Sequence, residues 1–329
     1  MRRSGRTSAD AGDAVSNQRH GNSTCSNAKG HAAMTNDLTP FYDDVQAHYD
    51  LSDEFFELFL DPTRTYSCAY FERDDMTLEE AQRAKVDLAL GKCDLEPGMT
   101  LLDVGCGWGS TMLRALDKYD VNVIGLTLSQ NQHDRVASLL EQRDNTGRSA
   151  EVRLQGWEDF DQPVDRIVSI GAFEHFRRER YDAFFDKCRN ILPADGRMLL
   201  HTITQYNRHD IRERGLPINR EVLEFAQFIQ NEIFPGGQLP EPTWVVDGAE
   251  AAGFAVERIH PLQQHYARTL EIWSATLQEK KDQAIAIASP EVYNTYVKYL
   301  SGCVDYFRKG YIDVMQFSLS KQQPPSVQQ

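Results

Sequence analysis

The stretch from Leu101 to Ser110 constrains the fold of this chain more than any other part of the sequence. It reads Leu-Leu-Asp-Val-Gly-Cys-Gly-Trp-Gly-Ser. The apolar run from Thr100 to Val104 predicts a buried parallel strand, and the three glycines allow a sharp turn and a close approach of a ligand to the backbone. A helix is expected to follow, from about Ser110 to Tyr119. A strand, a glycine loop and a helix in this order indicate the cofactor crevice of an open α/β sheet.

The details around this loop favour S-adenosylmethionine over a nicotinamide dinucleotide. Dinucleotide enzymes combine GxGxxG spacing with a ribose-binding carboxylate at the end of the next strand. Here the spacing is GxGxG. The next strand, Val121 to Leu126, is followed by Thr127-Leu128-Ser129, so the ribose-binding carboxylate is absent. The third strand, Ala150 to Leu154, is followed by Gly156-Trp157-Glu158-Asp159. An aromatic ring beside carboxylates suits an adenine base and its exocyclic amine.

Composition narrows the class of protein. The 329 residues are 41% hydrophobic, which is enough for a substantial core, and the net charge of -14 argues against a general nucleic-acid binder. No apolar run approaches the length of a membrane span, so we expect a cytoplasmic protein with at most peripheral membrane contact. Six cysteines, at positions 25, 68, 93, 106, 188 and 303, form no CxxC motif, so neither a metal site nor a disulfide framework is predicted.

The pattern along the chain predicts one main domain with short flanking segments. Residues 1–33 lack apolar periodicity and are expected to be disordered, or to be an extension upstream of a natural start at Met34; a native flexible arm is the alternative. Residues 34–321 are predicted to form a single domain, and residues 322–329 a flexible tail. Within the domain we expect N-terminal helices and an active-site loop (34–95), a cofactor-binding core (96–204), a helical substrate lid (205–242), and C-terminal strands and helices (243–321).

Several elements of this domain can be predicted individually. An aromatic-rich helix is expected over 45–60, an irregular loop over 61–71, and a helix over 77–92 that begins with a capping box of Thr77 and Glu80. Further along the chain we expect strands over 166–170, 197–203 and 254–259, helices over 181–191, 221–234 and 243–252, and long helices up to Tyr306. The alternation over 314–319 predicts an edge strand.

Polar residues follow or interrupt two of these strands. Glu174 lies just beyond the strand that ends at Ile170, and His201 interrupts an otherwise apolar strand. Because parallel strands end at the same edge of a sheet, both side chains are expected at the crevice, although a strand histidine can also be satisfied within the core. Phe225, Phe228, Ile229, Ile233 and Phe234 cover more than one stripe of the 221–234 helix. That pattern suits a helix between the sheet and an apolar ligand, or an ordinary buried cap helix.

These residues together resemble the mycolic acid cyclopropane synthases, a branch of the cyclopropane-fatty-acyl-phospholipid synthase family, over nearly the whole of 34–321. The matching stretches are Ala47-His48-Tyr49-Asp50-Leu51-Ser52-Asp53, Thr65-Tyr66-Ser67-Cys68-Ala69-Tyr70-Phe71, Leu101 to Gly109, Gly156-Trp157-Glu158, Gly171 to Phe176, Leu200-His201-Thr202, Ile233-Phe234-Pro235-Gly236-Gly237 and His265-Tyr266-Ala267. The resemblance implies a Rossmann-like class I S-adenosylmethionine-dependent methyltransferase, with a mostly parallel seven-stranded sheet, helices on both faces and a helical lid. The positions that match the family's cofactor-binding residues are Tyr66, Ser67, Gly105, Cys106, Gly107, Thr127, Leu128, Ser129, Gln130, Asn131, Gln132, Trp157, Glu158 and Ile170.

The resemblance also implies a substrate and a chemistry. The substrate would be a very long meromycolyl chain with a cis double bond, carried by an acyl carrier protein, and methylene transfer would form a cyclopropane ring. A bound bicarbonate would remove the proton from the carbocation, held by the side chains of Glu174, His201 and Tyr266 and the backbone N–H of Cys68. Since bicarbonate and Glu174 would both be anionic, we expect a shared proton or a cationic His201. Cys303 matches a cysteine to which a catalytic role has been attributed, although a packed thiol is the simpler interpretation.

Other outcomes and other classes of protein remain open at this point. Family members that hydrate the cation or form a methyl-branched alkene share the fold, although Gly171 and Glu174-His175-Phe176 look more like the ring-forming members. A small-molecule methyltransferase would need a polar substrate pocket, and a catalytically idle lipid-binding protein would not need Glu174, His201 and Tyr266 together. Arg177, Arg178 and Arg180 are one candidate for a basic patch that docks the acidic carrier protein, although a solvated helix start is the simpler interpretation.

Overall fold

The computed structural model describes residues 38–40, 53–143 and 147–322. The predictions for the first 33 residues, a start at Met34, most of the Ala47–Asp53 motif and the tail after Gln322 lie outside the described residues. The single domain over 34–321 and its internal boundaries also stay predictions. Of the expected 45–60 helix, the described part contains α2 (Asp53–Glu57), whose Phe55 and Phe56 are buried.

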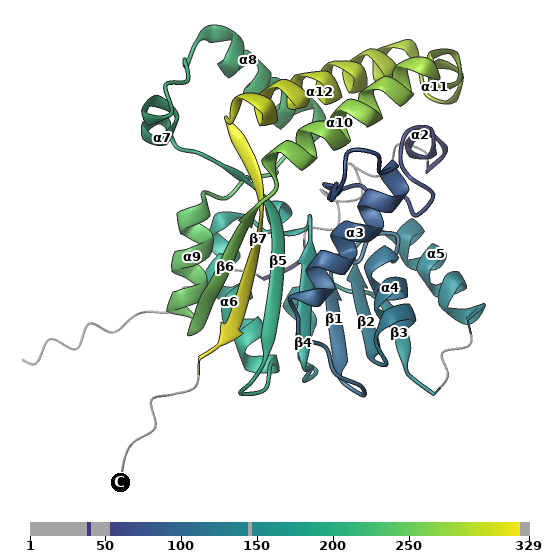
Figure 1. Ribbon diagram of the computed structural model, residues 1–329, viewed down its shortest axis with the longest axis vertical. Helices are drawn as coiled ribbons and strands as arrows, with labels where there is room; N and C mark the ends of the chain where they lie inside the picture. The colour runs from purple at the N-terminus through teal and green to yellow at the C-terminus, as the bar shows by residue number, and fades with distance from the viewer. Residues whose placement is uncertain (1–37, 41–52, 144–146, 323–329) are drawn as a thin grey trace, which may run out of the picture. The chain divides into compact units, whose positions relative to one another are not determined.

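Seven strands form one sheet in the order β3-β2-β1-β4-β5-β7-β6. The strands β1 to β5 pair in parallel, and β7 runs antiparallel to both of its neighbours (Figure 1). The mostly parallel seven-stranded sheet expected from the sequence is confirmed. The bounds are β1 Thr100–Val104, β2 Asn122–Thr127, β3 Ala150–Leu154, β4 Arg166–Ile170, β5 Arg197–Gln205, β6 Phe254–Pro261 and β7 Ile312–Lys321.

The prediction of an edge strand over 314–319 is wrong. β7 lies between β5 and β6, and it pairs with β5 along nine residues, from Arg197 opposite Ser320 to Gln205 opposite Ile312. Seven consecutive residues of β7, from Asp313 to Leu319, are buried. Both sides of the strand are paired and both faces are covered, so its polar residues lie inside the protein, and β6 takes the edge position.

Helices cover both faces of the sheet. On one face α3 (Leu78–Gly91), α4 (Ser110–Lys118) and α5 (Gln130–Glu141) pack on residues such as Leu101, Val123 and Leu199. On the other face α6 (Tyr181–Ile191) and α9 (Pro242–Ala251) pack on Leu102, Leu200 and Phe317. Thr77 and Glu80 form the predicted capping box at the start of α3. The central strands are therefore covered by apolar residues on both sides, as is usual for parallel sheets.

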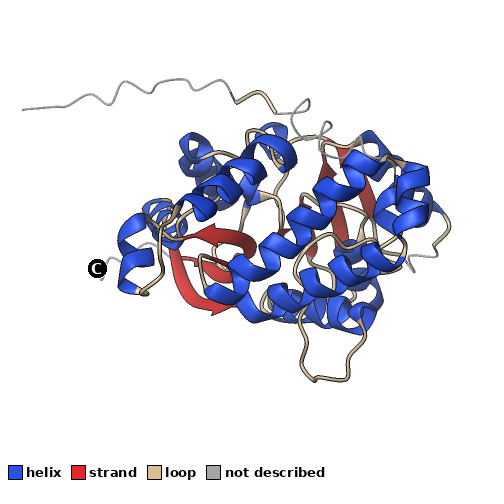
Figure 2. Ribbon diagram, turned by 90° about the horizontal axis from the view of Figure 1, so that it is seen from above, coloured by secondary structure: helices blue, strands red, loops and turns tan. Residues whose placement is uncertain are grey.

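A further group of helices lies beyond the carboxyl ends of the parallel strands (Figure 1). It comprises α7 (Arg208–Glu213), α8 (Arg220–Phe228), the π-helical turn η4 (Ile229–Ile233), α10 (Gln263–Glu279), α11 (Lys281–Ile287) and α12 (Pro290–Lys309). Seen from above, helices extend over the strand ends (Figure 2). The predicted lid insertion after β5 is present, but its main helix ends at Phe228 and continues as a π-helical turn.

None of the helices within the described ranges combines the length and apolar character that crossing a membrane requires.

Candidate active site

The glycine loop after β1 folds as the sequence predicts. Gly105 has a φ of +80°, and a Cβ at this position would overlap the Cβ of Ala172. The amides of Gly105 and Cys106 both donate to the carbonyl of Leu126 at the end of β2, at 3.0 and 2.9 Å. The backbone therefore turns tightly at the ends of β1 and β2, where only glycine fits.

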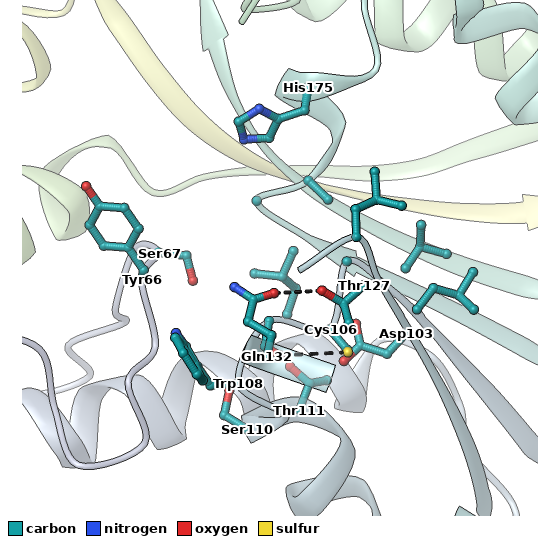
Figure 3. A pocket seen from close by; sticks show the side chains of 18 of the residues that line it. Tyr66, Ser67, Asp103, Cys106, Trp108, Ser110, Thr111, Thr127, Gln132 and His175 are labelled. Atoms are coloured by element: carbon teal, nitrogen blue, oxygen red, sulfur yellow. Dashed lines mark hydrogen bonds between the residues drawn. The ribbon is translucent and has the colours of Figure 1, made fainter. Parts of the chain in front are cut away.

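A cavity of about 140 Å³ opens at this loop, and we call it the glycine-loop cavity (Figure 3). Figure 3 shows Tyr66, Ser67 and Trp108 on one side of it, with Asp103, Cys106 and Thr127 on the other. The hydroxyl of Thr127 donates to Oε1 of Gln132 at 2.7 Å, which fixes both side chains at the rim. The predicted cofactor residues that line the cavity are Tyr66, Ser67, Gly105, Cys106, Gly107, Thr127, Leu128, Gln132, Trp157, Glu158 and Ile170.

The other three predicted cofactor residues do not line the glycine-loop cavity. The Ser129 side chain caps α5 by accepting from the amide of Gln132. Gln130 and Asn131 lie exposed in the first turn of α5, and the amide of Gln130 donates to Asp134. Of the run from Thr127 to Gln132, three residues therefore line the cavity: Thr127, Leu128 and Gln132. The residues between Leu128 and Gln132 form the start of α5.

One residue that lines this cavity, Glu158, belongs to a buried ion pair. In the short 3-10 helix η1 (Trp157–Asp159), Glu158 pairs with Arg180 at 3.1 Å, and both side chains are almost fully buried. Burial raises the pKa of Glu158 although Arg180 opposes this, and burial raises the pKa of Asp103 to about 7. Oε2 of Glu158 and Oδ2 of Asp103 have no hydrogen-bond partner among the described residues. Both are buried acceptor atoms of residues that line the cavity, and they suit the amine and hydroxyl groups of an adenosyl ligand.

The prediction that Arg177, Arg178 and Arg180 form a basic surface patch is therefore wrong for Arg180. Arg180 is buried against Glu158, and Arg178 is exposed but lies over the Trp244 ring, with its guanidinium carbon 4.1 Å from the ring centroid. The need to neutralise the buried Glu158 explains why Arg180 faces inward.

Lys85 is a further cavity residue that the sequence analysis missed. Its ammonium donates to the hydroxyl of Ser67 at 2.9 Å, while Nε2 of Gln82 donates to the Ser67 carbonyl at 2.8 Å. Burial lowers the pKa of Lys85 to about 8. Two polar side chains of α3 thus fix the loop that follows α2. The sequence does contain a signal that Lys85 is buried. Lys85 lies four residues from both Ala81 and Ala89, which places it on the apolar side of the helix.

A second cavity of about 440 Å³ lies under the lid, and we call it the lid cavity. All five predicted catalytic residues line it: Cys68, Glu174, His201, Tyr266 and Cys303. Phe225, Ile229 and Phe234 contribute apolar lid side chains, as the sequence predicts for a helix facing an apolar ligand. Tyr66, Ser67, Gly171 and His175 line both cavities, so the two spaces adjoin at the carboxyl ends of β1, β4 and β5.

Glu174 and His201 are both buried, and burial favours the uncharged form of each side chain. Burial raises the pKa of Glu174 to about 7, although its Oε1 accepts a hydrogen bond from the Ile203 amide at 2.6 Å. Burial also lowers the pKa of His201 well below its usual value, and Lys85 and Lys92 act in the same direction. Oε2 of Glu174 and Nε2 of His201 have no hydrogen-bond partner in the part of the chain that the structure describes. The site therefore holds two buried polar atoms without a partner, one from within β5 and one from the short turn that follows β4.

The other three predicted catalytic residues keep their protons in this buried environment. Burial raises the pKa of Tyr266, of Cys68 and of Cys303. Since neither thiol is readily ionised, neither has the environment of a reactive cysteine. Within the described ranges, no cluster of three or more His, Cys, Asp or Glu side chains is placed to hold a metal ion.

Comparison with known proteins agrees with this architecture. The model of the family "Mycolic acid cyclopropane synthetase" matches residues 36–317. Cyclopropane mycolic acid synthase 1 of Mycobacterium tuberculosis is 63% identical over 288 residues, which are 88% of this chain and all of that protein. Cyclopropane mycolic acid synthase 3 of the same species is 62% identical over the same share of each chain.

Solved structures show the same relationship. The cyclopropane synthase MmaA2 from Mycobacterium tuberculosis superposes with a TM-score of 0.85 at 60% identity, covering 87% of this chain and all of that one. Mycolic acid cyclopropane synthase CmaA1, complexed with SAH and CTAB, gives a TM-score of 0.84 at 63% identity with the same coverage. A coclaurine N-methyltransferase shares the fold, with a TM-score of 0.68 at 23% identity over 83% of this chain and 80% of its own. The fold is thus that of the class I S-adenosylmethionine-dependent methyltransferases, and the chain is an enzyme of the mycolic acid cyclopropane synthetase family.

Proposed function

We propose that this enzyme uses S-adenosylmethionine to convert a cis double bond of a very long, meromycolyl-type acyl chain into a cyclopropane ring. The observation that carries the proposal is the pair of adjoining cavities, one lined by the glycine loop and one by apolar lid residues and buried polar groups. A relative at 63% identity is described in complex with SAH and CTAB.

The glycine-loop cavity has the features that the adenosyl cofactor requires. Gly105 and Gly107 leave backbone without side chains along one wall, and Asp103 and Glu158 offer unused carboxylate oxygens. Trp157 supplies an aromatic surface beside Glu158, in a position that suits an adenine base. When bound, S-adenosylmethionine supplies an electrophilic methyl group on sulfur. Tyr66 and Ser67 would hold its methionine end, because they line both cavities.

The lid cavity has the features that an alkene substrate requires. An alkene is a weak nucleophile, so the protein contributes mainly by orienting it and by excluding water. Phe225, Ile229 and Phe234 close the cavity from the lid, and Tyr266 and Tyr299 face it from α10 and α12. The ring faces of such residues stabilise a carbocation by about 0.5–2 kcal/mol per contact.

The proton released on ring closure needs an acceptor, and we propose bicarbonate, held by Glu174, His201, Tyr266 and the backbone N–H of Cys68. The unused Oε2 of Glu174 and Nε2 of His201 support this, because a bound anion would give both atoms a partner. The raised pKa of Glu174 favours its protonated form beside an anion. Of the two expectations from the sequence, a shared proton is thus better supported than a cationic His201, whose pKa is lowered.

Mass spectrometry tests the proposal directly. A cis-alkenoyl substrate on an acyl carrier protein, our proposed carrier, is incubated with methyl-labelled S-adenosylmethionine, with the free fatty acid as a control. We expect the product to gain one CH₂ and to lose the double bond. A gain of CH₂ plus water would assign a hydroxylating enzyme, and a gain of CH₂ with a retained double bond would assign alkene methylation. Cofactor binding without any product would contradict the proposal and support an idle binding protein.

A further inference from the structure

Three side chains form a row across the antiparallel part of the sheet. Gln316 of β7 lies directly opposite His201 of β5 on one side and opposite His260 of β6 on the other. Residues in such register point to the same face of the sheet, with Cβ atoms about 4.5–5.5 Å apart. Gln316 is fully buried and His201 is 1% exposed. A buried amide in this position requires partners for both of its ends.

Lys92, at the C-terminal cap of α3, supplies one of these partners. Its ammonium donates to Oε1 of Gln316 at 2.6 Å and lies 3.1 Å from Nδ1 of His260. An ammonium group can only donate hydrogen bonds, so the oxygen of the Gln316 amide, and not its nitrogen, must face Lys92. The orientation of the amide is therefore fixed by charge.

The other end of the amide then determines the state of His201. Nε2 of Gln316 lies 3.2 Å from Nδ1 of His201, and an amide nitrogen donates. Nδ1 of His201 must accept, so the proton of the neutral imidazole is on Nε2. His201 is neutral because burial lowers its pKa, and Lys85 and Lys92 lower it further. His201 lines the lid cavity, and its Nε2 has no partner among the residues described.

We propose that Lys92 and Gln316 are positioning residues that hold His201 as its Nε2–H tautomer, so that His201 donates a hydrogen bond to an oxygen atom bound in the lid cavity. The catalytic role of this hydrogen bond rests on the proposed function. The tautomer of His201 is a property of the protein alone. Neither residue touches the lid cavity directly. The same arrangement explains why polar side chains are buried opposite one another on β5 and β7.

The tautomer can be measured without substrate. Protein labelled with 15N in its nine histidines is examined by long-range 1H–15N correlation, which distinguishes Nδ1–H from Nε2–H, and His201→Asn identifies the signal. We expect Nε2–H in the wild type. In Gln316→Glu the new carboxylate still accepts a hydrogen bond from Lys92. It has no N–H to donate to Nδ1 of His201, so we expect the imidazole proton to move from Nε2 to Nδ1, which then donates to the carboxylate. Wild-type protein in the Nδ1–H form, or an unchanged tautomer in Gln316→Glu, would overturn the proposal.

Activity provides the second measurement. A reversed tautomer presents a lone pair where a donor is needed, so Gln316→Glu should lower kcat about 10- to 100-fold with little change in the KM for the acyl substrate. Gln142→Glu, which adds the same charge at an exposed site in the C-terminal cap of α5, is the matched control and should keep wild-type values. Equal effects of the two substitutions would overturn the role of Gln316.

A second variant keeps the test valid if Gln316→Glu does not fold. Lys92→Met removes a half-buried charge at the end of α3 and frees the amide to flip, so both His201 tautomers should be seen. A single Nε2–H signal in that variant would contradict the role of Lys92. Wild-type protein that shows the expected tautomers but makes no cyclopropane would contradict the proposed function and leave this inference standing.

Discussion

At the scale of single residues, the site depends on polar groups that are buried without a full set of partners. Glu174 and Asp103 are both held at a pKa of about 7 by burial, each beside one of the two cavities. A carboxyl in this state is neutral over part of the physiological range, and it can share a proton with a bound anion or take part in a hydrogen bond as a donor. Such groups reduce the stability of the protein and are typical of functional sites.

This burial predicts a pH dependence of stability. The pKa of Glu174 rises from its ordinary value of about 4.5 to about 7 on folding, so the folded chain binds the proton more tightly. The contribution of Glu174 to the free energy of unfolding should therefore fall as the pH rises between these values, by on the order of 3 kcal/mol, and then level off. Asp103 contributes with the same sign. His201 contributes with the opposite sign, because its pKa is lowered on folding, but it does so in both wild type and Glu174→Gln. Urea denaturation of the two proteins between pH 4.5 and 8 should therefore show the wild-type free energy of unfolding falling relative to that of Glu174→Gln as the pH rises.

The control for this measurement is Glu279→Gln, which changes an exposed carboxyl at the end of α10 and should leave the pH dependence unchanged. A pH dependence of stability in Glu174→Gln that equals that of the wild type would contradict the prediction.

The sequence predicts part of this residue-level picture. Glu174 and His201 could be placed at the crevice because they follow and interrupt two neighbouring strands. Lys92 and Gln316 could not be connected to His201, because their contacts depend on the register between β5 and β7, more than a hundred residues apart. The protonation states could not be predicted either, since they depend on the depth of burial.

At the scale of elements, the lid is held by one close approach between helices. Phe225 of α8 packs against Gly302 of α12, and a Cβ at Gly302 would overlap the Phe225 ring. The Phe225 ring also lies 4.6 Å from that of Tyr306, one turn further along α12. The missing side chain at Gly302 thus determines how closely the lid approaches α12.

Gly302→Ala should therefore displace the Phe225 ring into the lid cavity or lift α8. We expect a several-fold higher KM for the long acyl substrate and unchanged affinity for SAH, because Gly302 does not line the glycine-loop cavity. Steady-state kinetics with acyl chains of different length and calorimetry with SAH would measure the two effects.

Ser301→Ala is the matched control, because Ser301 is the exposed neighbour of Gly302 and its hydroxyl donates to the Val297 carbonyl of its own helix. Kinetics of Gly302→Ala that equal those of Ser301→Ala would show that the close approach does not shape the substrate site.

Elements with strong local signals could be predicted from the sequence almost residue by residue. The strands over 150–154 and 166–170 and the helix over 181–191 have the predicted bounds. The helix predicted over 221–234 changes to a π-helical turn at Ile229, and apolar periodicity carries no information on such a change in hydrogen bonding. The position of β7 depends on which strands flank it, and alternation within one strand does not encode its neighbours.

At the scale of the whole molecule, the sheet joins the apolar cores that flank it, and β7 lies inside the sheet, between β5 and the edge strand β6. Phe317 is fully buried, and its partner across the ladder, Ile259 of the edge strand β6, is 41% exposed. The same ladder position therefore has a core residue on one strand and a surface residue on the next.

This pair provides a test of the strand order. Phe317→Ala should lower the free energy of unfolding by about 3–5 kcal/mol, because it leaves a cavity against Leu200 and Phe254. Ile259→Ala should cost less than about 1 kcal/mol, because much of its side chain stays in water. Chemical denaturation of both variants measures the difference. Similar costs for the two substitutions would mean that β7 is not enclosed.

The place of β7 also has a consequence for how the chain assembles. During synthesis β6 leaves the ribosome before β7, but β6 pairs with β7 and with no other strand of the described sheet. Until residues 312–321 arrive, β5 presents an open edge and β6 has no ladder to join. A nascent chain that has completed the glycine loop and the first five strands therefore still exposes unpaired backbone, a target for chaperones and a site for mispairing. The late, non-local pairing of β5 with β7 should thus limit the folding rate.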